Sequence, residues 1–357
     1  MRYLLLLLVG CGFSPTLLGD GGITGEGGSG SGSNTDFQYR KRVTLNVGSP
    51  AMLTDFPVSI VTVDAELAKR APDPGQIAFT DLSGTPLSRE IVAYEPSTGA
   101  LEAWLRIPQV TGSVDVYMVY GPGSPAEPMN VWRGYAAAWH FAELTAPFMD
   151  SAGGRTVSPP SPGATPTPTT AGIIGAAQSF DGSDDATSTA HDPTLDFGSG
   201  SFTIQAWVNV DTSANGYDEV LFNGGDNGLP GYMLTLGSGS WFAYVSDGIE
   251  RHTTFGLETA LLHRWNQLTA VVDRTANLLS TYVNGGFVSQ VSIANLNDVS
   301  STQAFQIGSL NSSYMFEGTV DELRLVRSAL GVDWIAAEYR NVSTRSSFVT
   351  FAPEETF

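Results

Sequence analysis

Short runs of alternating apolar and polar residues, separated by turn signals, constrain this chain more than any other feature of its sequence. Between Arg40 and Val47, the residues Val43, Leu45 and Val47 share one face and polar side chains share the other, which is the period of a half-buried strand. Glycine and proline number 40 and 20 of 357 residues, and many fall between such runs. Several short strands at near-regular spacing favour antiparallel sandwiches. We therefore predict an all-β protein.

The charge balance excludes one class of partner. The chain carries 36 acidic and 17 basic residues, a net charge of −19. Such a chain repels phosphate backbones and anionic lipid surfaces, so we expect no nucleic-acid binding. There is one cysteine, which excludes an intramolecular disulfide and any zinc site built on several thiolates.

The N-terminal residues have the plan of an export signal. Arg2 precedes an apolar run, Leu4–Leu8, that is too short to span a membrane as a helix. The run ends in Leu8-Val9-Gly10-Cys11, which resembles the bacterial lipobox. The resemblance implies a signal peptide at residues 1–10, lipid attachment at Cys11 and, because Gly12 follows, sorting to the outer membrane. The alternative is a free or buried cysteine in an ordinary signal peptide.

Two folded segments are predicted after a Gly/Ser-rich tether at residues 11–36. The first is a β-sandwich at residues 37–127 with one short helix, Ala65–Arg70. Its predicted strands are Arg40–Val47, Phe56–Val63, Ile77–Thr80, Arg89–Tyr94, Leu101–Ile107 and Val114–Tyr120.

The first segment contains four motifs of one family: Leu53–Val58, Ile77–Asp81, Trp104–Pro108 and Tyr117–Gly121. Together they resemble an uncharacterised bacterial envelope domain that commonly precedes a LamG-like domain. Some of its members occur in proteins connected with MotA/TolQ/ExbB-type channels. The resemblance supplies no catalytic residues.

The second segment, residues 131–354, contains a Pro/Thr-rich stretch at 158–170 that we expect to be an extended surface loop. Asn284-Gly285 is a tight-hairpin signal, and Val332–Tyr339 is the one convincing helix. The predicted strands lie at Ile173–Phe180, Phe202–Val210, Tyr232–Leu236, Trp241–Val245, Gln267–Asp273, Leu279–Val283, Phe287–Val291, Phe305–Ile307 and Thr319–Val326.

Four motifs in this second segment carry a further resemblance: Ala176–Gly182, Gly200–Val208, Trp265–Asp273 and Gly318–Arg324. They are similar to the LamG-like family, which implies a concanavalin A-like jellyroll. That architecture hosts lectins, glycanases and plain spacers, so fold alone leaves the function open.

The residues that hydrolysis requires are not evident. Glycanases on jellyrolls use paired carboxylates, and their Glu-x-Asp-x-x-Glu string does not occur here. Glu317, Asp321 and Glu322 come nearest, but neighbouring residues of a strand point to opposite faces. The four histidines have no metal-like spacing. We expect no enzyme, with a glycoside hydrolase as a distant alternative.

Two candidate sites follow from the sequence. The densest acidic cluster spans residues 181–185, and the resemblance allows a calcium ion between Asp181 and Asp321, which lie on strands that pair in this fold. The alternative is a simple turn. Trp241, Tyr232 and Tyr244 are candidates for stacking on a sugar, whereas Trp207 and Trp265 are expected in the core.

Together these features predict a lipid-anchored envelope protein, periplasmic or surface-exposed, that does not catalyse a reaction. Its LamG-like domain is expected to bind polysaccharide, glycoprotein or another envelope protein. A structural spacer without a specific ligand is the competing hypothesis.

Overall fold

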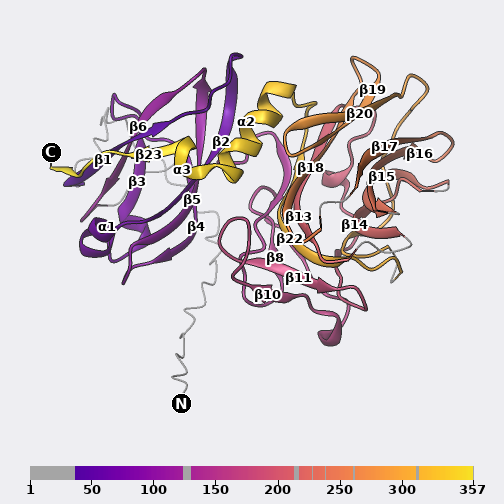
Figure 1. Ribbon diagram of the computed structural model, residues 1–357, viewed down its shortest axis with the longest axis horizontal. Coiled ribbons are helices and arrows are strands. Elements are labelled where there is room, and N and C mark those ends of the chain that lie inside the picture. The colour runs from indigo at the N-terminus through magenta and orange to yellow at the C-terminus, as the bar shows by residue number, and fades with distance from the viewer. Residues whose placement is uncertain are drawn as a thin grey trace, which may run out of the picture. The chain divides into compact units, whose positions relative to one another are not determined.

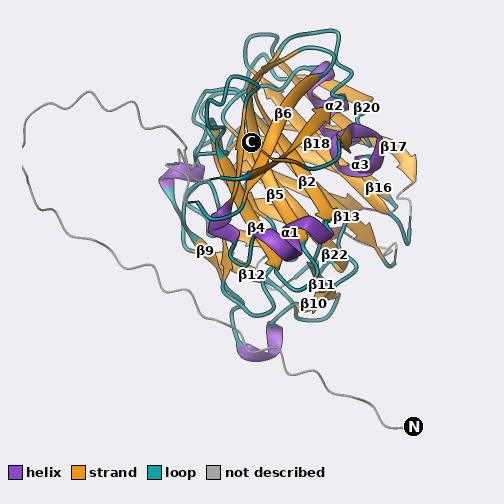
Figure 2. Cartoon of the chain, turned by 90° about the vertical axis from the view of Figure 1, so that its left-hand side faces the viewer, coloured by secondary structure: helices purple, strands orange, loops and turns teal. Residues whose placement is uncertain are grey.

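The computed structural model describes residues 37–123, 130–212, 217–226, 228–237, 239–259, 262–310 and 313–356, and residues 34–357 form one compact unit. Strands dominate this part of the chain, and those of the main sheets pair antiparallel (Figure 2). The predicted all-β class is therefore confirmed. No helix in the described ranges is long and apolar enough to cross a membrane.

The first sandwich packs two sheets around one apolar core. One sheet has the order β23-β1-β6-β3, with β24 also paired to β1, and the other has the order β2-β5-β4. Helix α1 (Ala65–Arg70) is capped by Asp64, the residue before it, whose side chain accepts a hydrogen bond from the Glu66 backbone N–H. The strands are β1 (Tyr39–Leu45), β2 (Leu53–Val63), β3 (Ile77–Thr80), β4 (Arg89–Glu95), β5 (Ala100–Val110) and β6 (Val114–Tyr120).

The end of the chain completes this first sandwich. Strands β23 (Val349–Phe351) and β24 (Glu355–Thr356) pair with β1, and the two segments lie side by side in Figure 1. Phe348 is buried in the same core as Val43. The sequence analysis assigned residues up to 354 to the second segment. The structure instead places the last strands in the first sandwich, because Val349 of β23 packs in its core and the backbones of both strands pair with the edge of β1.

The second sandwich also has two sheets. The larger has the order β10-β11-β22-β13-β18-β19-β20, with β7 paired to β22, and the other has the order β12-β21-β14-β15-β16-β17. Their inner faces enclose the largest apolar core. The strands are β7 (Tyr135–Trp139), β10 (Thr167–Thr169), β11 (Ala177–Asp181), β12 (Thr187–Thr189), β13 (Phe202–Val210), β14 (Tyr217–Asn223), β15 (Pro230–Gly237), β16 (Ser240–Asp247), β17 (Arg251–Thr259), β18 (Trp265–Asp273), β19 (Leu278–Val283), β20 (Gly286–Ser292), β21 (Phe305–Ile307) and β22 (Glu317–Val326), and a separate hairpin pairs β8 (Phe148–Met149) with β9 (Thr156–Val157).

The Pro/Thr-rich stretch at 158–170 is more ordered than predicted. Its β10 pairs with β11 at the edge of the larger sheet, and Ala164 is buried. Pro168 is compatible with this strand because an edge strand leaves one side of its backbone unpaired. The prediction of a purely extended loop is therefore wrong for 167–169.

Helix α2 (Val332–Ser343) and the short α3 (Arg345–Phe348) link the two sandwiches. The amide of Asn341 covers the open edge of β2: its Oδ1 accepts from the Ser59 N–H at 3.1 Å, and its Nδ2 donates to the Pro57 carbonyl at 3.2 Å. Asn341 is fully buried, so these backbone groups of β2 have no access to water there. The Asn341 amide therefore makes the hydrogen bonds that a neighbouring strand would otherwise make.

Candidate functional site

A pocket with a cavity volume of about 240 Å³ opens on the outer face of the six-stranded sheet of the second sandwich. Strands β14, β15, β16 and β17 each contribute side chains to it, and two loops close it. Its lining residues are Glu219, Asp226, Met233, Thr235, Tyr244, Arg251, Leu310 and Tyr314.

The register of the β15–β16 hairpin decides which side chains reach this pocket. Met233 lies opposite Tyr244, and both project from the outer face. Tyr232 and Trp241 occupy positions of the opposite parity and lie in the apolar core, with the Tyr232 hydroxyl donating to the Leu195 carbonyl. Of the three predicted ligand-binding residues, only Tyr244 lines the pocket. The assignment of Tyr232 and Trp241 to a binding surface is wrong.

The deepest polar group in this pocket is the carboxyl of Glu219. Its side chain is 1% exposed, and Oε1 has no hydrogen-bond partner within the described part of the chain. Burial raises the pKa of Glu219 well above its usual value, the Thr235 hydroxyl opposes that shift, and the nearby Asp226 and Asp218 carboxylates reinforce it. Burial therefore favours the protonated form of Glu219, which can donate a hydrogen bond to the cavity.

The other polar groups of the pocket are already organised. Arg251 donates from Nη1 to Asp226 Oδ1 at 2.8 Å, and its guanidinium lies 5.4 Å from the centre of the Tyr244 ring. Tyr314 is 51% exposed. The pocket thus places a few fixed donors and acceptors beside two aromatic rings, an arrangement typical of small-ligand sites.

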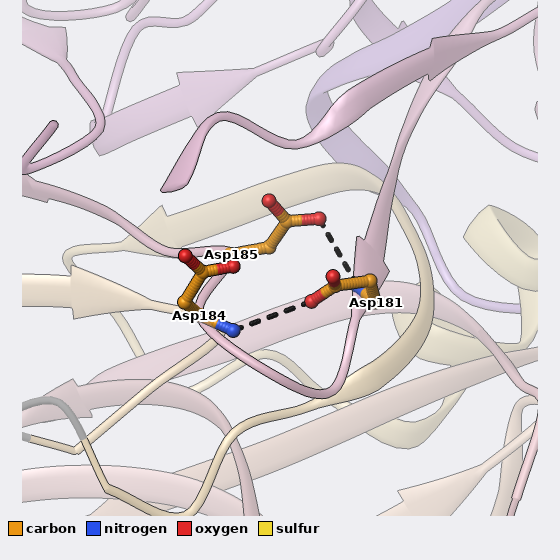
Figure 3. Close-up of side chains that lie close together, drawn as sticks. All are labelled: Asp181, Asp184 and Asp185. Atoms are coloured by element: carbon orange, nitrogen blue, oxygen red, sulfur yellow. Dashed lines mark hydrogen bonds between the residues drawn. The ribbon is translucent and has the colours of Figure 1, made fainter. Parts of the chain in front are cut away.

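The predicted acidic cluster forms a compact turn after β11 (Figure 3). Asp181 Oδ1 accepts from the backbone N–H groups of Ser183 and Asp184, and Asp185 Oδ2 accepts from the Asp181 N–H. One carboxylate oxygen from each of Asp181, Asp184 and Asp185 lies within 4.8 Å of the others. Burial and the Asp181 charge raise the pKa of Asp185 to about 6, as expected where carboxylates crowd together.

Asp321 does not join this cluster. In the β11–β22 ladder Asp181 lies opposite Glu317, whereas Val320, the neighbour of Asp321, lies opposite Gln178. Asp321 is fully buried, and its Oδ2 accepts from the Ile174 N–H at 3.1 Å. A calcium site that uses both Asp181 and Asp321 is therefore wrong. Calcium at the 181–185 turn stays a prediction.

A buried charge network joins the two sandwiches. Arg324 lies between Trp104 of β5 and Trp132, with ring centres 4.2 and 4.8 Å from the guanidinium carbon. The same guanidinium pairs with Glu338 of α2 at 2.5 Å and with Glu322. Each member is buried, so these ion pairs hold the interior of the junction together.

His140 belongs to that network. Its Nδ1 lies 2.8 Å from Glu322 Oε1 and its Nε2 lies 3.4 Å from Glu90 Oε2. Burial opposes the charged form, but the two carboxylates outweigh it and raise the pKa of His140 well above its usual value. Both ring nitrogens are engaged by carboxylates, so neither is free to accept a proton from a ligand.

The two packed antiparallel sheets define a concanavalin A-like domain, and sequence comparison agrees. Residues 181–336 match the family model described as the concanavalin A-like lectin/glucanases superfamily. The resemblance predicted for this segment is thereby confirmed over those residues. Trp207 is buried, but not between the two sheets: it lies in the apolar cluster that includes Trp104 and Ile335 of α2, and Trp265 packs partly buried against the same cluster.

Solved structures with a similar fold include toxin binding domains. The binding domain of Paraclostridial Mosquitocidal Protein 1 is 13% identical, with 58% of this chain and 52% of that chain covered at a TM-score of 0.50. The binding domain of botulinum neurotoxin serotype G is 13% identical, with 57% and 50% covered at a TM-score of 0.47. The chain thus spans about half the length of the structures it matches. The search of curated protein sequences found no match.

Proposed function

We propose that this protein is a non-catalytic envelope lipoprotein whose concanavalin A-like domain binds a glycan in the Glu219 pocket. The observation that carries the proposal is a buried carboxyl with one oxygen that has no partner among the described residues, set beside an ion pair and two tyrosines. A buried polar atom without a partner is costly, and a ligand hydroxyl in the cavity would satisfy it.

Calorimetric titration of the full chain with oligosaccharides tests this site. Tyr244→Ala should weaken binding by at least about tenfold, since stacking and hydrogen-bonding contacts are lost together. Phe287→Ala is the matched control, because Phe287 is an exposed aromatic residue on the other sheet of the same sandwich. Equal weakening by both variants would refute the assignment of the pocket.

The lipid anchor is part of the proposal. Cys11 and the tether lie outside the described residues, so the supporting observation is the lipobox-like sequence alone. Replacing Cys11 with Ala should move the protein from the membrane fraction to the soluble fraction. An unchanged distribution, or native protein without a lipid label, would contradict the anchor and with it the outer-membrane location.

Two alternatives make different predictions. A structural spacer should bind no glycan and should tolerate substitutions in the pocket. The distant alternative, a glycoside hydrolase, draws on a pair of acids that the sequence did not predict. Glu219, whose pKa is raised by burial, and Asp226 line one pocket. Asp226 is engaged by Arg251, which favours binding over attack on a sugar. Release of reducing ends from a bound oligosaccharide would establish hydrolysis.

A further inference from the structure

We propose that the Glu219 pocket selects uncharged sugars and that Glu219 is the residue that enforces this selectivity. The inference rests on the proposed function and adds the chemical class of the ligand. It follows from a count of charges and hydrogen-bonding groups around the cavity.

The pocket has no charge left to bind an anion. Among the described residues that line it, Arg251 is the one basic side chain, and it is paired with Asp226 at 2.8 Å. Asp218, the neighbour of Glu219 on β14, does not line the cavity, but its charge adds to the effect of Asp226 on Glu219. A carboxylate or sulfate on the sugar would face the Asp226 carboxylate, and Arg251, the one basic residue of the described lining, is already paired.

The pocket also disfavours a cation. Glu219 is only 1% exposed, so its ionised form lacks most of the solvation that a carboxylate needs to hold an ammonium group. Its carboxylic acid form instead donates one hydrogen bond, and Oε1 or its hydroxyl accepts from a ligand hydroxyl. A sugar hydroxyl matches both roles, because it donates and accepts.

Sugars that differ only in charge provide the sharpest test. The full chain is titrated with N-acetylated chitohexaose and its free-amine form, with methyl-esterified hexagalacturonate and its free-acid form, and with cellohexaose and mannohexaose. We expect at least one uncharged hexasaccharide to bind, and a charged counterpart to bind at least about tenfold more weakly. Tighter binding of either charged form would overturn the selectivity.

Variants of Glu219 test its role separately. Glu219→Gln keeps the shape, a donor and an acceptor without ionising, so it should bind the uncharged sugar within about threefold of the native chain. Glu219→Leu removes both hydrogen bonds and should weaken binding by at least about tenfold. Thermal unfolding checks that both variants fold. Glu250→Gln, at an exposed position in the turn before β17, is the control. Unchanged binding by the Leu variant would overturn the role of Glu219.

A pH series adds an independent readout. The titratable groups that line the cavity with Glu219 are Asp226, Arg251, Tyr244 and Tyr314, and Asp218 is its neighbour on β14. The Gln variant retains all of them. Binding by the native chain should weaken as rising pH ionises Glu219, whereas the Gln variant should show a flatter profile. Identical profiles would contradict the donor role.

These experiments separate the inference from the proposed function. If a charged sugar binds best and Tyr244→Ala abolishes that binding, the glycan site stands and the selectivity is refuted. If no sugar binds the native chain, both are refuted.

Discussion

Glu102 offers a quantitative test of the junction between the sandwiches. Its carboxyl projects from β5 against the turn at residues 172–175, where a Cβ on Gly175 would lie 2.0 Å from Glu102 Oε2. Burial is the largest cause that raises the pKa of Glu102, to about 7, and the Glu322 and Glu90 charges add to it. His140 and Arg345 act in the opposite direction but do not cancel the effect.

The pKa sets the size and the sign of the effect on stability. The pKa rises from 4.5 to about 7, and each pKa unit corresponds to about 1.36 kcal/mol, so ionising Glu102 in the folded protein costs about 3 kcal/mol. Between pH 4.5 and 7 the folded state binds more protons than the unfolded state. The contribution of Glu102 to stability is therefore complete below pH 4.5 and is lost as the pH rises to 7.

Replacing Glu102 with Gln removes this titration. The free energy of unfolding of the variant, minus that of the native chain, should increase by about 3 kcal/mol between pH 4.5 and pH 8. Urea unfolding at several pH values measures the difference, and the other titrating groups largely cancel from it. Glu95→Gln is the matched control: Glu95 is a solvent-exposed acid, and the Ser97 hydrogen bonds lower its pKa. If the difference in the free energy of unfolding between Glu102→Gln and the native chain does not change between pH 4.5 and pH 8, the reasoning is refuted.

Three further predictions concern the interior and the acidic turn. Arg324→Met should lower the free energy of unfolding by about 3–5 kcal/mol, because it leaves buried carboxylates without their partner. The control Arg133→Met, at a 70% exposed side chain, should lower it by less than about 0.5 kcal/mol in the same urea assay. Phe348→Ala should cost about 3–5 kcal/mol and speed proteolysis of residues 37–123, since its ring fills their core. If the 181–185 turn binds calcium, a chelator should lower the melting temperature of the native chain, and Asp184→Asn should abolish that decrease. The same melting temperature with and without chelator would show that the turn binds no calcium.

Most strands follow from local sequence. The predicted bounds of β3, β6, β13 and β21 coincide with the observed ones, and helix α1 begins and ends as predicted. In these segments the period-2 pattern and the turn residues act over a few neighbouring positions. The concanavalin A-like segment was placed by the resemblance of its motifs to the LamG-like family, which the family match at residues 181–336 supports.

The candidate site could not be found in this way. Strand β14 carries Asp218-Glu219, two consecutive acids that argue against a strand in any local pattern, and its pairing with β15 and β21 overrides that preference. Tyr244 could be separated from Tyr232 and Trp241 by strand parity, but which parity faces the core depends on the other sheet.

The sequence by itself determined the all-β class, most strand positions and the concanavalin A-like segment. Three features could be read only from the tertiary structure. Strands within residues 349–356 pair with β1, and Asp321 lies apart from Asp181. Glu219 is buried beside Arg251 and Asp226. The physical reason is the separation in sequence over which each property is set. Strand periodicity depends on adjacent residues, whereas register and burial depend on contacts between residues far apart in the chain, and the pKa shifts follow from burial.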